Sequence, residues 1–256
     1  MADSVPPPHK RERLRVATLN LWGRFADWPA RRMLLARRLP AYEIDIYLLQ
    51  EVVRGEDGGD QLTELSELLG YDWTARVVAE SRPHEAEHEG VAIVSRVPFS
   101  ATAVWPLPPS HPPRHLLEAT VEWRGKQLSL FTLHAAVTAE DGRDQQVSFL
   151  AGLGNDPLLL GADLNAPPSL VEARLGARLS DTLVWDTDPT WPVNADEFIQ
   201  AWTDKLGTPP AGKPRPGRLD YLLYRGLTIA ASGTLTLADT QRSASDHRLV
   251  WADLVM

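Results

Sequence analysis

The chain of 256 residues contains no cysteine. Disulfide bonds and thiolate metal sites are therefore excluded, and any metal site must be built from oxygen and imidazole donors. Long hydrophobic runs are also missing. No stretch approaches the about 20 consecutive apolar residues that a membrane-spanning helix requires, so the sequence predicts no membrane segment.

Basic residues are in deficit. Lysine and arginine total 26 against 34 acidic residues, which gives a formal net charge of −8. Nucleic acid is therefore not indicated as a partner by charge, although a local basic patch is compatible with this balance. Residues 1–12 are polar and proline-rich without an apolar core, so they do not resemble a secretory signal peptide. We expect them to form a disordered leader, and we expect a cytoplasmic, monomeric protein with one domain over residues 13–256.

The hydrophobic pattern predicts many short strands and a few helices. Strands are expected at residues 14–21, 44–49, 71–78, 89–96, 101–107, 116–123, 127–133, 158–160, 218–224, 227–237 and 247–254. Helices are expected at residues 28–39, 62–69, 141–153, 169–175 and 195–202. Residues 80–89, which hold two histidines among four glutamates, are expected to be an exposed charged loop. This content favours an α/β fold in which two packed β-sheets are flanked by helices.

One stretch near the middle of the chain carries the first candidate site residues. The apolar residues 158–160 predict a buried strand, Gly161 is expected to end it, and Asp163 and Asn165 follow. In extended backbone, residues two apart project to the same side. A carboxylate can hold a metal or take a proton from water, and a carboxamide can donate to a phosphate oxygen. The same spacing is common in turns and helix caps, so the pair gains meaning only from partners elsewhere.

Polar residues also stand at the ends of other apolar strands. They are Asn20, Glu51, Glu89, His134, Asp220, Asp246 and His247. Each alone is an ordinary strand-end residue, but together they indicate that several strand ends converge on one cleft. Several carboxylates at such close range repel one another unless a cation lies among them, and Mg²⁺ is the commonest hard divalent ion with oxygen ligands. Histidines beside acids suit a site that handles phosphate charge and protons.

These motifs recur in a fixed order along the chain. They are Thr18-Leu19-Asn20, Leu49-Gln50-Glu51, residues 90–96, Thr132-Leu133-His134, residues 161–165, Arg218-Leu219-Asp220-Tyr221 and Ser245-Asp246-His247. In order and spacing the sequence resembles the endonuclease/exonuclease/phosphatase superfamily, which includes deoxyribonuclease I, apurinic endonucleases, neutral sphingomyelinases and inositol polyphosphate 5-phosphatases. The resemblance implies a four-layered α/β sandwich with two mixed sheets. It also implies a Mg²⁺-dependent phosphoesterase, with Mn²⁺ as a substitute ion.

The resemblance assigns roles to the metal-site residues by position. Glu51 is implied to be the main Mg²⁺ ligand, with Asn20 close to the metal and the phosphate. Asp246 is implied to be a further carboxylate of the metal site. Asp163 would orient or deprotonate the attacking water, and Asn165 would donate to a phosphate oxygen.

The resemblance also pairs each histidine with an acid. His247 would contact the phosphate while Asp220 holds it, and His134 would lie on the other side, paired with Glu89. Both rings are expected to act as imidazolium cations that offset the phosphate charge. Together with the metal they would support in-line attack of an activated water.

Departures from the family pattern bear on the substrate. Apurinic endonucleases have a tyrosine where His134 stands and an aromatic residue where Gly217 stands, which disfavours abasic-site repair. Arg114 stands where deoxyribonuclease I has a phosphate-contacting arginine. Arg218 is a second candidate for substrate binding, although its basic segment reads equally well as a solvated loop.

Three functions remain open at this point. The first is a Mg²⁺-dependent phosphodiesterase or phosphomonoesterase with a small or medium-sized substrate. The alternative is a DNA or RNA endonuclease of the deoxyribonuclease I type. The third is a catalytically inactive binding module. The sequence does not name the substrate, because fold and site chemistry are shared across the superfamily.

Overall fold

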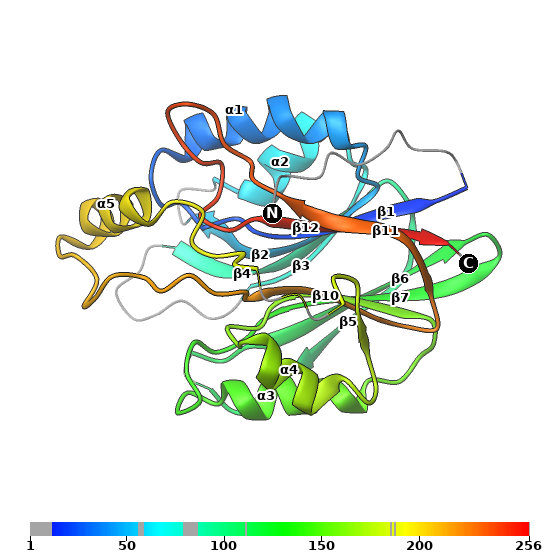
Figure 1. Cartoon of the computed structure of the whole chain (residues 1–256). Coiled ribbons are helices and arrows are strands. Elements are labelled where there is room, and N and C mark those ends of the chain that lie inside the picture. The colour runs from blue at the N-terminus through cyan, green and yellow to red at the C-terminus, as the bar shows by residue number, and fades with distance from the viewer. Residues whose placement is uncertain are drawn as a thin grey trace.

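The computed structural model describes residues 12–55, 59–78, 87–110, 112–184, 186 and 188–255. Nearly all of the predicted leader and most of the predicted charged loop at residues 80–89 lie outside the described residues. Two six-stranded sheets pack against each other, and helices cover their outer faces (Figure 1). The predicted four-layered α/β sandwich is confirmed.

Both sheets are mixed. The first has the order β11 (Thr228–Leu235), β12 (Leu249–Val255), β1 (Leu14–Asn20), β2 (Ile46–Gly55), β4 (Glu87–Ser95) and β3 (Trp73–Val78). The second has the order β5 (Phe99–Pro106), β6 (His115–Trp123), β7 (Lys126–His134), β8 (Leu158–Asp163), β10 (Asp220–Arg225) and β9 (Ser180–Asp181). Strand β1 pairs with β2 in parallel, as β7 does with β8, and the other neighbours are antiparallel.

The core lies in three layers. Apolar side chains of both sheets, among them Leu48, Leu130 and Val250, interlock between the sheets. A second cluster joins the first sheet to α1 (Trp28–Arg38) and α2 (Gln61–Leu69). A third joins the second sheet to α3 (Arg143–Phe149), the short 3₁₀ helix Leu150–Gly152 and α4 (Pro168–Leu175). Among the described helices, none is both long and apolar enough to cross a membrane.

Most predicted elements are present, with corrections at their ends. Strand β2 was expected to end at Leu49 but continues to Gly55, and β8 was expected to end at Gly161 but continues to Asp163. Strand β12 begins at Leu249 rather than at residue 247. The hairpin β6–β7 turns through Arg124 and Gly125, whose φ angles of 53° and 75° are typical of a two-residue type I′ turn.

Gly161 has a packing role. A Cβ atom there would lie 2.6 Å from Leu48 Cδ1 and 3.0 Å from Thr18 Cβ, both in the opposite sheet. We expect Gly161→Ala to lower the free energy of unfolding by about 1–3 kcal/mol because it overpacks the core between the sheets. Gly154→Ala is the matched control, since no atom lies within 4 Å of its added Cβ. Urea denaturation of both variants measures the difference, and equal stabilities would contradict the packing role.

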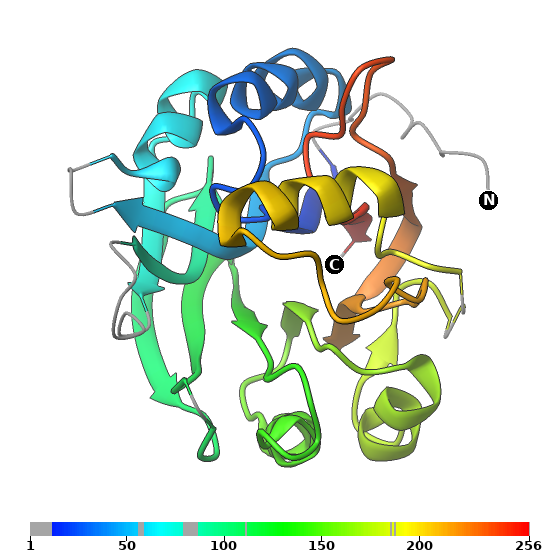
Figure 2. The ribbon, with the colours of Figure 1, turned by 90° about the vertical axis from the view of Figure 1, so that its left-hand side faces the viewer.

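The strand pairing brings the predicted site residues to one edge. In the second sheet, His134 is registered against Asp163, and Asp163 against Asp220. In the first sheet, Asn20 ends β1, and the segment that carries Asp246 and His247 leads into the antiparallel neighbour β12. A hydrogen bond from Asn20 to Asp163 joins these two groups of residues, so they lie at the same edge of the sandwich. Helix α5 (Ala195–Leu206) lies across this edge in Figure 2, where it is yellow.

Candidate active site

Asn20 connects the two sheets at the candidate site. Its Nδ2 donates to Glu51 Oε1 at 2.8 Å and to Asp163 Oδ2 at 3.0 Å. Its Oδ1 accepts from the backbone N–H of Trp22 at 2.8 Å, so the orientation of the amide is fixed. Because Glu51 belongs to the first sheet and Asp163 to the second, one buried carboxamide holds carboxylates of both sheets together.

A backbone irregularity positions Glu51. The pairing of β2 with β4 shifts register between Leu49 and Val52, and Glu51 has a φ of 50°. A bulge re-aims a side chain, and a non-glycine residue in left-handed backbone is strained. Glu51 was expected directly after the strand. It lies inside a longer strand and reaches the site through this bulge.

Asp163 and Asn165 form a turn as well as a polar pair. The backbone N–H of Asn165 donates to Asp163 Oδ1 at 3.0 Å, and Asn165 has a φ of 48°. The expected extended geometry is therefore wrong at Asn165, although its side chain still meets the cluster. Asn165 Nδ2 lies 3.0 Å from His134 Nε2 and donates to Ala135 O at 3.1 Å. The turn thus fixes a carboxylate and a carboxamide beside one imidazole.

His247 is held by Asp220 and lies near two further acids, Asp163 and Asp246. Its Nδ1 lies 2.9 Å from Asp220 Oδ2, so an Nδ1–H donates to that carboxylate. Its Nε2 lies 3.8 Å from Asp163 Oδ2 and 3.9 Å from Asp246 Oδ1. Asp246 Oδ2 in turn accepts from Trp191 Nε1 at 2.8 Å.

His134 Nδ1 lies 4.0 Å from both Glu51 Oε1 and Glu89 Oε1, so the predicted pairing with Glu89 is shared with Glu51.

The acids of the cluster are shifted toward their neutral forms. Burial raises the pKa of Glu51 to about 8, with Glu89 and Asp246 adding repulsion. Burial also raises the pKa of Asp163 to about 6 and raises that of Asp246. A cluster with this balance has an excess of negative charge once all its carboxylates ionise.

The two histidines are shifted in opposite directions. Burial would lower the pKa of His247, but Asp220 and Asp246 outweigh it and raise that pKa well above its ordinary value. Burial, reinforced by Arg114 and His247, lowers the pKa of His134 well below its ordinary value. The expectation of two imidazolium cations is therefore wrong for His134, which is neutral because it is buried near other cations.

Oxygen and imidazole atoms gather closely enough to hold a metal ion. Ligand atoms of Glu51, Glu89 and His134 lie within 4.8 Å of one another, as do those of Asp163, Asp220 and His247. Within the described part of the chain, Asp246 Oδ1 is buried without a hydrogen-bond partner. An oxygen-rich, buried acidic set of this kind suits a hard divalent cation.

Sequence reasoning missed Arg31, a buried cation behind the site. Its guanidinium donates to the backbone oxygens of Leu21, Trp22, Gly23, Phe25 and Ala244. It therefore ties the loop after Asn20 to the loop before Asp246. Burial lowers the pKa of Arg31 only to about 10, so it remains charged at neutral pH. Nothing in the local sequence separates it from the other arginines of its helix.

The two arginines predicted to bind the substrate, Arg114 and Arg218, differ in position. Arg114 is close enough for its charge to depress the pKa of His134, so it lies near the cluster. The prediction that Arg218 binds the substrate is wrong. Its side chain has no exposed surface and forms an ion pair with Asp181 at 2.7 Å. Its guanidinium also lies over the ring of Tyr221. A buried, paired guanidinium is structural and is not available to a substrate.

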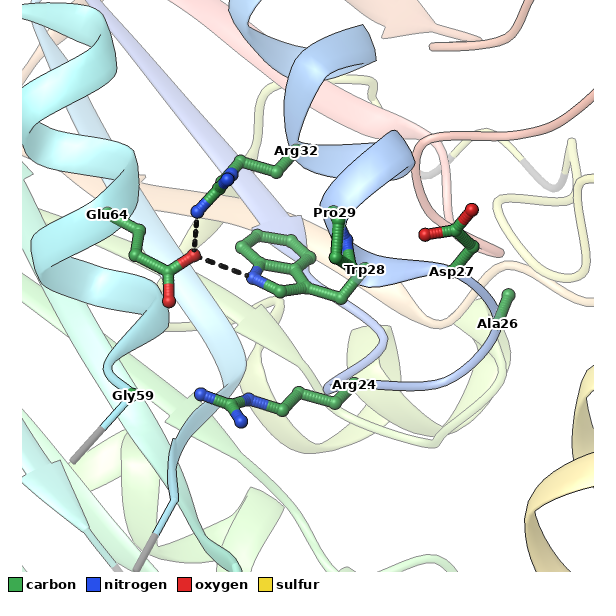
Figure 3. A pocket seen from close by; sticks show the side chains of 8 residues that line it. All are labelled: Arg24, Ala26, Asp27, Trp28, Pro29, Arg32, Gly59 and Glu64. Atoms are coloured by element: carbon green, nitrogen blue, oxygen red, sulfur yellow. Dashed lines mark hydrogen bonds and ion pairs between the residues drawn. The ribbon is translucent and has the colours of Figure 1, made fainter. Parts of the chain in front are cut away.

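A pocket of about 510 Å³ opens at the start of α1. Figure 3 shows its lining residues: Arg24, Ala26, Asp27, Trp28, Pro29, Arg32, Gly59 and Glu64. Glu64 accepts from Trp28 Nε1 at 3.0 Å and pairs with Arg32. None of the predicted site residues lines this pocket, so it is separate from the acidic cluster.

Solved structures with the same fold come from several organisms. An endonuclease/exonuclease/phosphatase from Beutenbergia cavernae is 25% identical, with a TM-score of 0.70 over 96% of this chain and 72% of that one. TDP2 of D. rerio, solved with a single-strand DNA product, is 18% identical, with a TM-score of 0.73 over 95% and 99%. The catalytic domain of human Nocturnin with bound sulfate is 21% identical, with a TM-score of 0.68 over 96% and 94%.

A search of curated protein sequences gave no match. The model of the endonuclease/exonuclease/phosphatase family, in contrast, matches residues 17–247. That span contains Asn20 at one end and His247 at the other, with every carboxylate of the cluster between them. This chain belongs to the endonuclease/exonuclease/phosphatase family.

Proposed function

We propose that this chain is a Mg²⁺-dependent phosphoesterase that hydrolyses a phosphodiester or phosphomonoester by in-line attack of water. The observation that carries the proposal is the meeting of Glu51, Asp163 and His247 at one edge of the sandwich through Asn20 and Asp220. Members of the matched family act on phosphate esters, and the acidic balance of this chain favours a small or medium-sized substrate over a long polyanion.

Glu51 and Asp246, with Asn20 beside them, would hold the cation. The raised pKa of Glu51 and the lack of a hydrogen-bond partner for Asp246 Oδ1 are what a buried carboxylate site has before a positive charge is supplied. A divalent cation bound there would polarise a phosphoryl oxygen and offset the charge of the acids. Within the protein, the hydrogen bond from Asn20 keeps Glu51 in place for this role.

Asp163 would orient the attacking water and accept its proton. Donors on Asn20 and Asn165 fix both carboxylate oxygens, and a pKa of about 6 suits a general base near neutral pH. A carboxylate held at both oxygens cannot rotate away from the water that it aligns. One N–H of the Asn165 amide is held by Ala135 O; the other, which lies 3.0 Å from His134 Nε2, would turn to a phosphate oxygen when the substrate binds.

The two histidines would have different roles. His247, charged and fixed by Asp220, would donate from Nε2 to a phosphoryl oxygen as negative charge builds there. His134 would act as a neutral ring, because burial and the nearby cations lower its pKa. With Nε2 accepting from the amide of Asn165, its proton would lie on Nδ1. That Nδ1–H faces Glu51 and Glu89, so His134 would help to orient the carboxylates.

A DNA or RNA endonuclease is the second candidate. One observation favours it: the structurally similar TDP2 of D. rerio was solved with a single-strand DNA product. An enzyme that tracks a nucleic-acid backbone loses affinity steeply as salt rises, whereas hydrolysis of a small ester does not. The salt dependence of turnover therefore separates the two candidates.

The experiment that tests the proposal compares a chromogenic phosphodiester, a phosphomonoester, plasmid DNA and a phospholipid head group as substrates. Each is incubated with Mg²⁺ and, separately, with EDTA. We expect hydrolysis of at least one small ester with Mg²⁺ and none with EDTA. Absence of turnover on all four substrates with Mg²⁺, or turnover that persists in EDTA, would contradict the proposal.

Removal of the metal should make the stability of the protein sensitive to pH. Burial raises the pKa of Glu51 in the folded protein to about 8, whereas the ordinary pKa of a glutamate is 4.5, so the relevant window lies between these two pH values. The folded state thus binds more protons in this window, so the free energy of unfolding falls as pH rises through it. Mg²⁺ requires the ionised carboxylates, so it should raise the melting temperature more at about pH 9 than at about pH 6.

Thermal unfolding in EDTA and in Mg²⁺ at both pH values measures this effect. Glu51→Gln is the control, because it removes the titrating group and should abolish most of the difference. A Mg²⁺ effect that is equal at both pH values, or larger at the acid one, would contradict the assignment of Glu51 as a ligand.

A further inference from the structure

A row of aromatic side chains leads from the acidic cluster to helix α5. In order outward from His247 it contains Trp191, Phe198, Trp202, Phe25 and Trp22. Successive ring centroids are 6.3, 5.2, 5.8, 5.9 and 6.2 Å apart, all within the range of favourable aromatic pairs. We call these five residues the aromatic row. They come from the loop before α5, from α5 itself and from the loop after Asn20.

The aromatic row is more open than packing alone requires. Trp22 is buried, but Phe25, Trp191, Phe198 and Trp202 keep part of their surface in solvent. Helix α5 has only one buried residue, Ala201. The two aromatic side chains of α5 are only partly buried, and the helix adds little to the hydrophobic core. It therefore leaves apolar surface that a further molecule can contact.

The inner end of the row is fixed to the site. Trp191 Nε1 donates to Asp246 Oδ2, and the ring of Trp191 is 6.3 Å from that of His247. The first turn of α5 is fastened as well, because both carboxylate oxygens of Glu197 accept from the backbone N–H of Ser243. In Figure 2 the helix crosses the edge where the two sheets meet. A group attached to a phosphate at the cluster would therefore meet the aromatic row.

The charges around the row restrict what that group is. Helix α5 carries Asp196, Glu197 and Asp204 against one lysine, Lys205, whose Nζ lies 4.5 Å from the centroid of Phe25. An acidic helix disfavours a second phosphate along the row, but it does not hinder a neutral flat ring. Base stacking on aromatic side chains is a contact that needs only a π-face.

We infer that the aromatic row binds the nucleobase of a nucleotide whose phosphate lies at the acidic cluster. The inference rests on the proposed function, because it assigns the neighbouring part of the same substrate. It selects nucleotides over sugar phosphates and over polyphosphorylated substrates. Phe198 and Trp202 lie one helical turn apart on α5, with ring centroids 5.8 Å apart, and both keep part of their surface in solvent.

Calorimetric titration with adenosine monophosphate and with ribose 5-phosphate tests the inference. The two ligands differ only in the base. Titrations use Mg²⁺ and the Asp163→Asn variant, so that neither ligand is consumed. We expect adenosine monophosphate to bind about tenfold more tightly or better, and Phe198→Ala or Trp202→Ala to remove about 5- to 100-fold of its affinity. Binding of ribose 5-phosphate should change less than about twofold in these variants.

Phe149→Ala is the matched control, since Phe149 is a partly exposed phenylalanine on α3, outside the row. It should alter neither affinity. Equal affinity for the two ligands, or an equal loss of both in the row variants, would overturn the inference. The readout is independent of turnover. If the unsubstituted protein hydrolyses none of the four esters but still discriminates between the two ligands, the proposed function fails and the base site stands.

Discussion

Asp163→Asn is expected to lower kcat by about 10²- to 10³-fold, with a smaller change in KM. The substitution keeps the size of the side chain but removes its charge and its capacity to take a proton, and it leaves one oxygen for the two donors on Asn20 and Asn165. Burial is the largest cause of the raised pKa of Asp163, ahead of the attraction of His247 and the repulsion of Asp220. Loss of the charge removes the cost of burying a carboxylate, so the melting temperature of the metal-free protein should stay constant or rise. Steady-state kinetics on the best ester of the panel, with thermal unfolding in EDTA, measures both.

Asp144→Asn is the control for this prediction. Asp144 is a solvent-accessible carboxylate on α3 that pairs with its neighbour Arg143. The Asp144→Asn variant should have the same kcat and KM as the unsubstituted protein. If Asp163→Asn retains normal kcat, or loses activity only because the protein unfolds, then Asp163 is not the residue that activates water.

Arg31→Met should give the largest loss of stability among the variants considered, about 3–5 kcal/mol in the free energy of unfolding. The substitution leaves five backbone oxygens of two loops without their donor. It also removes a cation that stacks on Trp22 and Trp28 at 5.1 and 5.3 Å. Since these loops adjoin Asn20 and Asp246, metal-dependent stabilisation should weaken together with the fold.

Two further substitutions separate charge from geometry in this prediction. Arg31→Lys keeps the charge but loses the planar fork of donors, so it should recover only part of the stability. Arg37→Met, on the same helix, removes a solvent-exposed arginine 3.7 Å from Asp239 and should cost about 1 kcal/mol or less. Urea denaturation curves that superimpose for the Arg31→Met and Arg37→Met variants would show that the hydrogen bonds of Arg31 to the two loops do not stabilise the fold.

The order of elements could be read from the sequence because it depends on local patterns. Alternation of apolar residues located β1 and β7, and Gly125 marked the turn between β6 and β7. Ends of elements were less predictable, since tertiary contacts decide them. Gly161, a common strand terminator, continues β8 because the close approach of the two sheets leaves no space for a side chain.

The cluster was predictable in its membership but not in its protonation. The ordered series of polar residues at strand ends identifies which acids and histidines form the cluster. It does not tell how deeply each is buried, and burial affects protonation. Whether His134 carries a charge depends first on its burial and then on the nearness of Arg114 and His247, none of which a sequence pattern reports. For the same reason Arg218 was misassigned: its neighbours in sequence are basic and exposed, while its partner Asp181 lies 37 residues away.

Trp191 and Arg31 were missed because their roles arise from long-range contacts. Trp191 reaches Asp246 across 55 residues, and Arg31 reaches Ala244 across 213. Trp191 does stand in a long proline-rich segment, where functional residues are common. That signal marks the segment but does not identify the residue.

Anomalous diffraction from crystals grown with Mn²⁺ and inorganic phosphate tests the central claim most directly. The account predicts a Mn²⁺ ion bonded to the carboxylate of Glu51 and lying beside Asp246, with a phosphate oxygen on the same ion and within hydrogen-bond distance of His247 Nε2. A cation bound only elsewhere on the protein, or no bound cation at a concentration that supports turnover, would contradict it.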